Sequence, residues 1–183
     1  MGEFQVSKKV LILSGSPRKG GNSNTLSDKF MEGAKEAGHE VEKIFVTDQK
    51  IGFCRACYAC RNTGKCFQKD DMDAILDKIV AADVVVLSSP VYFYAINGQM
   101  KTLLDRTLPQ WTKIRDKEFY YILTAAEDSK EIMLRSVECF RGFADCFQGS
   151  VEKGVIYGHG LYEKKEVQGS LYVEQAYNMG KKV

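Results

Sequence analysis

Four cysteines are the first residues in this chain whose spacing suggests chemistry. They are Cys54, Cys57, Cys60 and Cys66, in the pattern Cys-x2-Cys-x2-Cys-x5-Cys. Four thiolates within thirteen residues are what one cuboidal iron–sulfur cluster needs from a loop wrapped around it. Zinc is one alternative, although four-thiolate zinc sites usually draw on two separated pairs of cysteines. A loop of free thiols is the other alternative.

A second candidate site is the polar run from Ser14 to Thr25. It follows four consecutive apolar residues, 10–13, which predict a strand buried on both faces. Ser23 or Asn24 then supplies the N-cap of a predicted helix that continues to Gly38. Hydroxyl groups beside the free N–H groups of a helix N-terminus favour an anion.

The type of anion follows from what this run lacks. A Walker A loop needs Lys and Ser or Thr where Gly21 and Asn22 stand, and the dinucleotide fingerprint Gly-x-Gly-x-x-Gly is interrupted by Ser16 and Pro17. The sequence therefore favours one terminal phosphate over a triphosphate or a pyrophosphate. The alternative is a glycine-rich turn whose only role is to start a helix.

Two further loops follow predicted buried strands. Residues 88–94 contain Pro90 and three aromatic side chains, and residues 124–127 follow the strand predicted at 119–123. Pro90 is expected to end the strand at 84–87, because proline cannot donate to a central ladder. A phosphate in the first loop and aromatic side chains in the second describe a phosphorylated planar ring as the ligand.

These loops depend on a particular order of elements. Strands are predicted at 10–13, 41–46, 84–87, 119–123 and 151–157, and helices alternate with them at about 23–37, 72–80, 97–107, 129–147 and 170–180. This alternation predicts an α/β, flavodoxin-like, three-layer doubly wound fold with a five-stranded parallel sheet in the order 2-1-3-4-5. We expect residues 1–183 to form one domain, with a cysteine-rich insertion loop at about 51–69.

Three strings of sequence resemble a known superfamily. They are LSGSPRKGGNSNTL, SSPVYFYAINGQMKTLLDR and CRACYACRNTGKCFQKDDM. In that spacing they are similar to the NADPH-dependent FMN reductase and multimeric flavodoxin superfamily, in particular its iron–sulfur flavoproteins. The resemblance implies FMN as cofactor and a [4Fe–4S] cluster on the four cysteines.

The same resemblance assigns residues to the cofactor. It implies that the phosphate is held by Ser16, Arg18, Ser23, Asn24 and Thr25, with Ser14 and Asn22 in the same site. The ring is expected beside Pro90, Val91, Tyr92 and Phe93, with Asn97 approaching it and Thr124, Ala125 and Ala126 at its far edge. No catalytic acid or base is predicted, because hydride chemistry belongs to the flavin.

Composition narrows the partners. The 183 residues carry 26 basic and 24 acidic side chains, a net charge of +2, which indicates neither nucleic acid nor an anionic membrane surface as partner. No apolar run approaches the length of a membrane span, so we expect a cytoplasmic protein. The resemblance implies a homodimer or homotetramer that takes electrons from NAD(P)H or a ferredoxin-like protein. The alternative function is a flavodoxin-like redox-sensing or binding module whose cysteine loop binds zinc or stays metal-free.

Overall fold

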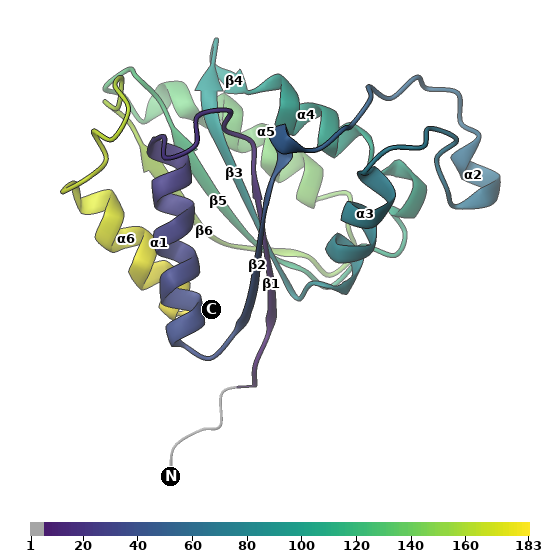
Figure 1. Cartoon of the computed structure of the whole chain (residues 1–183), viewed down its shortest axis with the longest axis horizontal. Coiled ribbons are helices and arrows are strands. Elements are labelled where there is room, and N and C mark those ends of the chain that lie inside the picture. Colours follow the sequence, from purple (N-terminus) through teal and green to yellow (C-terminus); the bar gives the residue numbers. More distant parts are fainter. Residues whose placement is uncertain (1–5) are drawn as a thin grey trace.

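The computed structural model describes residues 6–183, so the first five residues of the predicted domain lie outside the described part. Strands and helices alternate along the chain (Figure 1). The strands are β1 (Lys9–Ser14), β2 (Glu40–Phe45), β3 (Val84–Tyr92), β4 (Ala95–Ile96), β5 (Glu118–Thr124) and β6 (Val151–Gly158). The α-helices are α1 (Asn22–Glu36), α2 (Cys60–Thr63), α3 (Met72–Ala81), α4 (Gly98–Asp105), α5 (Leu134–Ala144) and α6 (Leu171–Lys181). Short 3-10 turns are η1 (Val46–Asp48), η2 (Leu108–Gln110) and η3 (Glu131–Met133).

The parallel strands lie in the order β2-β1-β3-β5-β6. Counted among parallel strands alone, this is the predicted order 2-1-3-4-5, and the doubly wound, flavodoxin-like fold is confirmed. The difference is β4, a two-residue strand that pairs antiparallel with the end of β3. It lies between the predicted loop at 88–94 and the helix predicted from about 97, and two residues are too few to show a pattern.

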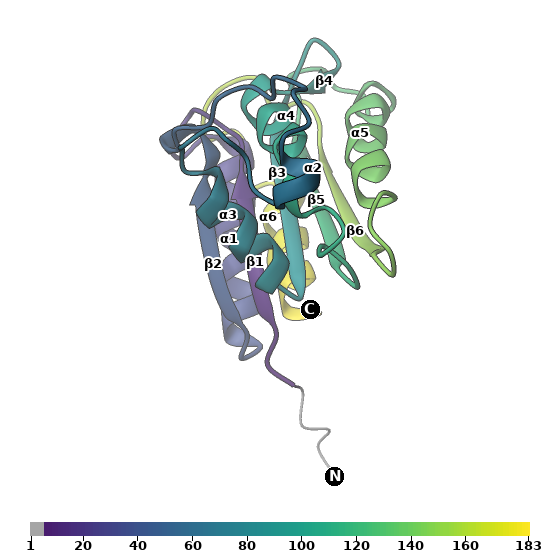
Figure 2. The same cartoon turned by 90° about the vertical axis from the view of Figure 1, so that its right-hand side faces the viewer.

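The helices cover both faces of the sheet (Figures 1 and 2). Alternate residues of the central strands point to opposite faces: Val10 and Ile12 pack with α1 and α6, whereas Leu11 and Leu13 pack with α3, α4 and α5. Both faces of β1 and β3 are therefore apolar, which explains their uninterrupted runs of hydrophobic residues. None of the described helices is long and apolar enough to cross a membrane.

Pro90 does not end β3, and that prediction is wrong. The strand continues to Tyr92, and Pro90 pairs with Thr124 of β5. The pairing of β3 with β1 stops at Ser88, so from there β3 has a parallel neighbour on one side only. A missing N–H at such an edge costs no ladder hydrogen bond, which is where proline is tolerated in a strand.

The predicted helix at 129–147 is also shorter than expected. Its first turn is the 3-10 turn η3, and α5 ends at Ala144. The apolar side of α5 buries Val137 and Phe140 against the sheet.

Candidate functional site

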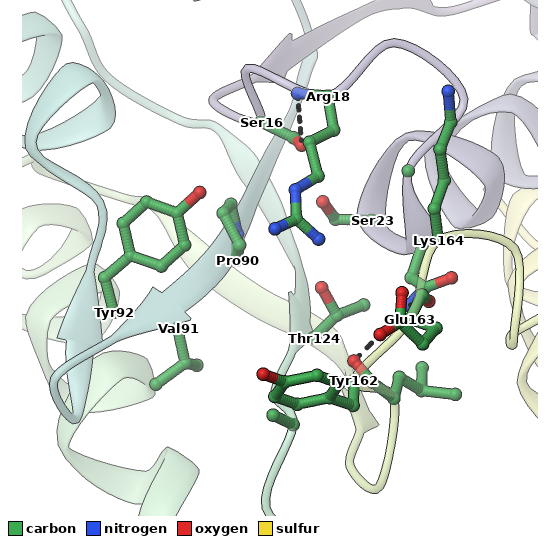
Figure 3. A pocket seen from close by; sticks show the side chains of 14 residues that line it. Ser16, Arg18, Ser23, Pro90, Val91, Tyr92, Thr124, Tyr162, Glu163 and Lys164 are labelled. Carbon is green, nitrogen blue, oxygen red and sulfur yellow. Dashed lines mark hydrogen bonds between the residues drawn. The ribbon is translucent and has the colours of Figure 1, made fainter.

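A cavity of about 380 Å³ opens at the carboxyl ends of β1, β3 and β5 (Figure 3). Its walls come from the loop after β1, the end of β3, the end of β5 and the loop after β6. The lining residues are Ser16, Arg18, Gly21, Asn22, Ser23, Pro90, Val91, Tyr92, Thr124, Ala126, Leu161, Tyr162, Glu163 and Lys164. The volume lies in the range of small-molecule and cofactor sites.

One end of the cavity is the N-terminus of α1. Its N-cap is Gly21, which offers no side chain, and among the described residues the backbone N–H groups of Asn22, Ser23 and Asn24 have no acceptor. Gly21 is needed here because a Cβ atom would lie only 2.9 Å from the carbonyl oxygen of Arg18. Unpaired N–H groups and the positive end of the helix dipole make this end of the cavity suited to an anion.

Two cations reach the same end of the cavity. Figure 3 shows the guanidinium of Arg18 pointing into the cavity beside Ser23, whereas Lys164 runs past the start of α1 with its amine directed away from that guanidinium. Arg18 and Lys164 form no ion pair within residues 6–183. The side chain of Lys164 also lies against the polar run from Ser14 to Thr25, which we call the phosphate-binding candidate loop. Its Cε atom is 3.7 Å from where a Cβ of Gly20 would be. Two unpaired cations beside free amides describe a site for a doubly charged anion.

The other end of the cavity is broader and less polar. Pro90, Val91 and Tyr92 form one wall, and Thr124 and Tyr162 face them across the opening in Figure 3. Tyr92 and Tyr162 are 44% and 72% exposed, so their rings are available to a ligand. A flat apolar group fits between such walls.

Several residues predicted to contact the cofactor are absent from the cavity wall. Ser14 and Asn24 are buried, and the Ser14 hydroxyl bonds to Oδ1 of Asn24, whose Nδ2 donates to the carbonyl of Arg18 over 2.7 Å. The hydroxyl of Thr25 donates a hydrogen bond to the carbonyl of Gly21 over 3.1 Å. These three side chains therefore hold the shape of the loop between β1 and α1.

Three predicted ring contacts are also elsewhere. Phe93 is 99% exposed on the turn between β3 and β4, whereas Ala125 is buried beneath the rim. Asn97 is buried and is the N-cap of α4: its Nδ2 bonds to the carbonyl of Gly15, and Ser89 Oγ donates to its Oδ1 over 3.1 Å. Asn97 thus ties the first loop to β3 and α4 from below the cavity.

The loop after β6 supplies the lining residues that the sequence did not identify. The side chain of Asn22 holds this loop in place, because its Nδ2 donates to the carbonyl of Glu163 over 2.8 Å and its Oδ1 accepts from the N–H of Val167 over 3.3 Å. The signal was available in the topology, since the loop after the last parallel strand opens at the same edge as the other three.

The four cysteines line a separate hollow on the loop between η1 and α3, which projects beyond α3 and α4 in Figure 1. The hollow measures about 20 Å³, and Phe67, Leu108 and Pro109 form its apolar wall. Cys54 and Cys57 are exposed, whereas Cys60 and Cys66 are half-buried. Burial raises the pKa of the Cys60 thiol, and the nearby thiols of Cys66, Cys57 and Cys54 raise it further.

The backbone of this loop is strained around Cys57. Ala56 and Tyr58 have φ values of 50° and 56°, a region that residues with a Cβ rarely adopt. Within residues 6–183, no three side chains of the metal-ligating types are gathered closely enough to hold a metal ion as they stand. Strain of this kind is typical of segments that wrap a ligand.

Arg106, at the end of α4, forms the floor of the cysteine hollow. It is 2% exposed, and its terminal nitrogens bond to both carboxylate oxygens of Asp70, at 2.7 and 3.0 Å, and to the carbonyl of Gly52, at 2.6 Å. Its Nε, in contrast, is the only buried side-chain nitrogen or oxygen of the described residues that lacks a hydrogen-bond partner. An unpaired buried donor is costly, so its presence indicates that an acceptor is missing from this arrangement of the loop.

Comparison with known proteins gives this geometry a context. Residues 8–134 match the family model of the NADPH-dependent FMN reductases. The chain is 41% identical over 101 residues to an iron–sulfur flavoprotein of Archaeoglobus fulgidus, covering 55% of this chain and 46% of that protein. It is 40% identical over 100 residues to an iron–sulfur flavoprotein of Methanosarcina thermophila, covering 55% and 52%. The chain thus spans about half the length of these curated relatives in the matched regions.

Solved structures share the fold over nearly the whole chain. An NAD(P)H:quinone oxidoreductase from Methanothermobacter marburgensis superimposes with a TM-score of 0.76 at 15% identity, covering 96% of this chain and 98% of that one. An azoreductase from Bacillus anthracis gives a TM-score of 0.76 at 18% identity, covering 96% and 100%. At these identities the likeness is one of fold.

Proposed function

The chain belongs to the NADPH-dependent FMN reductase family, and we propose that it is an FMN-dependent oxidoreductase that binds its cofactor in the cavity at the carboxyl edge of the sheet. The observation that carries this proposal is the anion end of that cavity. Three unpaired amides of α1 and two unpaired cations meet there, beside a slot with aromatic walls. FMN joins one phosphate to one flat ring, and its charge and shape fit these two ends.

The chain's own residues have distinct roles in this proposal. Arg18 and Lys164 neutralise the phosphate, and the amides of Asn22 and Ser23 with the Ser23 hydroxyl donate hydrogen bonds to it. Pro90 and Val91 on one side and Thr124 on the other border the ring. Tyr162 covers the opening and limits the access of water. Bound FMN supplies hydride and single-electron chemistry, and the protein orients it and tunes its surroundings.

The four cysteines are proposed to hold a [4Fe–4S] cluster. Two observations support a metal centre there: four thiols line one hollow, and the buried Nε of Arg106 in its floor lacks an acceptor. Such a cluster exchanges single electrons. Zinc is the second candidate, favoured by the narrowness of the hollow, because about 20 Å³ is near the space of one water molecule and a cluster requires the loop to open.

We extend the proposal to the setting of the reaction. Residues 1–183 act as one flavodoxin-like domain in which 51–69 is an insertion, and NAD(P)H or a ferredoxin-like protein is the electron donor. The protein works in the cytoplasm as a homodimer or homotetramer. The exposed aromatic side chains of Tyr92, Phe93 and Tyr94 support an assembly, since exposed aromatics are enriched at interfaces.

The test of the FMN site is a binding titration. We expect Arg18→Gln, Lys164→Gln and Ser23→Ala each to weaken FMN binding, the two charge changes by about tenfold or more, because each removes a charge-assisted contact to the phosphate. Quenching of flavin fluorescence measures the dissociation constant. Lys153→Gln, which removes an exposed cation on β6 far from the cavity, is the matched control. Unchanged affinity in all three variants would show that the phosphate lies elsewhere.

Riboflavin distinguishes the two ends of the site. Because riboflavin lacks the phosphate, its affinity is expected to be the same for the wild type, Arg18→Gln and Lys164→Gln. A loss of riboflavin binding equal to the loss of FMN binding would mean that the substitutions disturb the cavity as a whole.

The cysteine site is tested by anaerobic purification with quantitation of iron and zinc. About four iron atoms per chain, with a broad absorbance shoulder near 400 nm that disappears on reduction, is the expected result for a [4Fe–4S] centre. One zinc atom per chain and no iron would show that the cysteines bind zinc, and would favour the alternative function as a redox-sensing or binding module. Absence of both metals, combined with reversible oxidation of the thiols, would indicate a metal-free redox sensor.

A further inference from the structure

Arg106 is connected to both ends of the cysteine loop. Two hydrogen bonds between Lys50 and Asp71 close the neck of the loop. The N–H of Asp71 donates to the carbonyl of Lys50 over 3.0 Å, and the N–H of Lys50 donates to the carboxylate of Asp71 over 2.6 Å. Just inside the neck, Arg106 bonds to Gly52 on one arm and to Asp70 on the other. The guanidinium of Arg106 therefore links the two segments that flank the four cysteines.

The pair with Asp70 does not satisfy Arg106 completely. The carboxylate of Asp70 accepts hydrogen bonds from both terminal nitrogens of the guanidinium, and it also accepts one from the N–H of Gly52 over 3.0 Å. Although burial alone raises the pKa of Asp70, the hydrogen bonds from Arg106 and from two backbone amides lower it below its usual range. The carboxylate and the guanidinium thus stay charged together, and Nε is the one nitrogen of the guanidinium that has no hydrogen-bond partner among the described residues.

Cys66 and Arg106 line the same hollow. Arg106 is one hydrogen-bond donor in the wall around the Cys66 thiol. The side-chain amide of Gln68 is a second donor on the same sulfur, with Nε2 4.0 Å from Sγ of Cys66. Donors therefore gather around Cys66, and both Arg106 and Gln68 line the cysteine hollow.

We propose that Arg106 is a positioning residue of the metal centre: its Nε–H donates a hydrogen bond to the sulfur at Cys66, and its charge raises the reduction potential of that centre. This inference rests on the proposed cluster. Reduction by one electron, delivered by the flavin or by an external reductant, makes a thiolate-ligated cluster one unit more negative and transfers no proton. A cation and an N–H donor at the sulfur stabilise the reduced form more than the oxidised form.

Two substitutions separate this electrostatic role from a structural one. Arg106→Gln removes the positive charge and the Nε–H, whereas Asp70→Asn removes the opposing negative charge and leaves the guanidinium in place. Both break the same ion pair and loosen the same neck. If Arg106 only held the loop, the two variants would behave alike; if it acts on the cluster, their reduction potentials shift in opposite directions.

The experiment is a redox titration of the anaerobically reconstituted protein with dithionite, followed by electron paramagnetic resonance of the reduced cluster. We expect a lower midpoint potential in Arg106→Gln, a higher one in Asp70→Asn, and a smaller decrease in Arg106→Lys, which retains the charge without the fixed fork of donors. Arg115→Gln, which removes an exposed arginine from another loop, is the control and is expected to keep the wild-type potential.

The outcomes are distinguishable. Potentials that shift in the same direction in Arg106→Gln and Asp70→Asn, or that do not shift, overturn the role of Arg106 while leaving the cluster intact. A wild-type protein that takes up no iron overturns the cluster and this inference together. If Arg106→Gln does not fold, the comparison of Arg106→Lys with Asp70→Asn keeps the same test, since opposite shifts are expected for that pair too.

Discussion

At the scale of single residues, the two sites are marked by groups without partners. Arg18 and Lys164 form no ion pair with a carboxylate of the described residues. The amides at the start of α1 and Nε of Arg106 have no hydrogen-bond acceptor there. Elsewhere in residues 6–183 buried polar side-chain atoms are satisfied. A protein interior leaves donors unpaired only at a cost, so the buried Nε of Arg106 marks a place where the fold is prepared for a ligand. Arg18 and Lys164 are exposed, and it is their position on the wall of the cavity that relates them to a ligand.

His39 gives a prediction at this scale that does not involve either site. It is buried between α1 and β2, where its Nδ1 accepts from the N–H of Lys8 over 3.1 Å. Burial lowers the pKa of His39, and the charge of Lys8 lowers it further, although Glu118 raises it. The unfolded chain therefore binds a proton at His39 at a higher pH than the folded protein does.

We expect His39→Asn, which keeps an acceptor near Nδ1, to reduce the loss of stability in acid. The contribution of neutral His39 is complete above its unfolded pKa of about 6.5 and is lost as the pH falls through the lower folded pKa. Urea unfolding of the wild type and the variant at pH 8 and pH 5 measures the effect. A difference between the two proteins that is independent of pH would contradict the prediction.

At the scale of elements, the hairpin between β3 and β4 is the least regular part of the site. Its two turn residues, Phe93 and Tyr94, both have positive φ, 48° and 63°, and neither is glycine. Two-residue hairpin turns with that geometry favour Asn-Gly, because a Cβ is disfavoured in the left-handed region. The strain lies next to the cavity wall formed by Val91 and Tyr92.

Replacing the turn by Phe93→Asn and Tyr94→Gly is expected to stabilise the protein by about 1 kcal/mol, by removing that strain. For a chain of this size the melting temperature should rise by roughly 2–4 °C. Phe93→Ala is the matched control: it removes the exposed ring, with whatever that ring contributes to the assembly, but keeps a Cβ at positive φ, so the strain is measured by comparing the double variant with this control. A double variant no more stable than this control would show that the turn is not strained.

At the scale of the whole molecule, the layer formed by α1 and α6 carries the anion end of the cavity, because α1 begins there. The two helices approach closely at Gly33 and Gly180. A Cβ at Gly180 would lie 2.1 Å from the carbonyl oxygen of Phe30, and one at Gly33 would lie 2.1 Å from that of Tyr177. Only glycine allows the backbones to meet at this distance.

Gly180→Ala is therefore expected to destabilise the protein by about 1–3 kcal/mol, since α6 must move away from α1 to admit the methyl group. Gly142→Ala is the control of opposite sign. Gly142 lies within α5 with open space where its Cβ would be, so alanine there should stabilise the helix by up to about 1 kcal/mol. Urea unfolding of both variants decides the matter; equal effects would mean that helix propensity alone, and not the contact of α1 with α6, controls these positions.

The sequence by itself determined the parallel sheet, its order and the presence of two chemically distinct loops. Short uninterrupted apolar runs such as 10–13 and 84–87, followed by turn residues, are typical of strands covered on both faces, and this requires helices on both sides. Ser16, Arg18 and Ser23 could be predicted near the cavity because they lie between the end of β1 and the first turn of α1, and the spacing of the four cysteines placed them on one loop.

The tertiary structure alone decided which of the neighbouring residues face the cavity and which support it. Asn24, Thr25 and Asn97 have polar side chains as Ser23 does, but theirs are used by hydrogen bonds within the fold. Lys164 and Tyr162 reach the site from a loop about 140 residues after the phosphate-binding candidate loop, and Arg106 reaches the cysteines from the end of α4. Such contacts depend on how distant elements pack, and local sequence patterns extend only over neighbouring turns and strands.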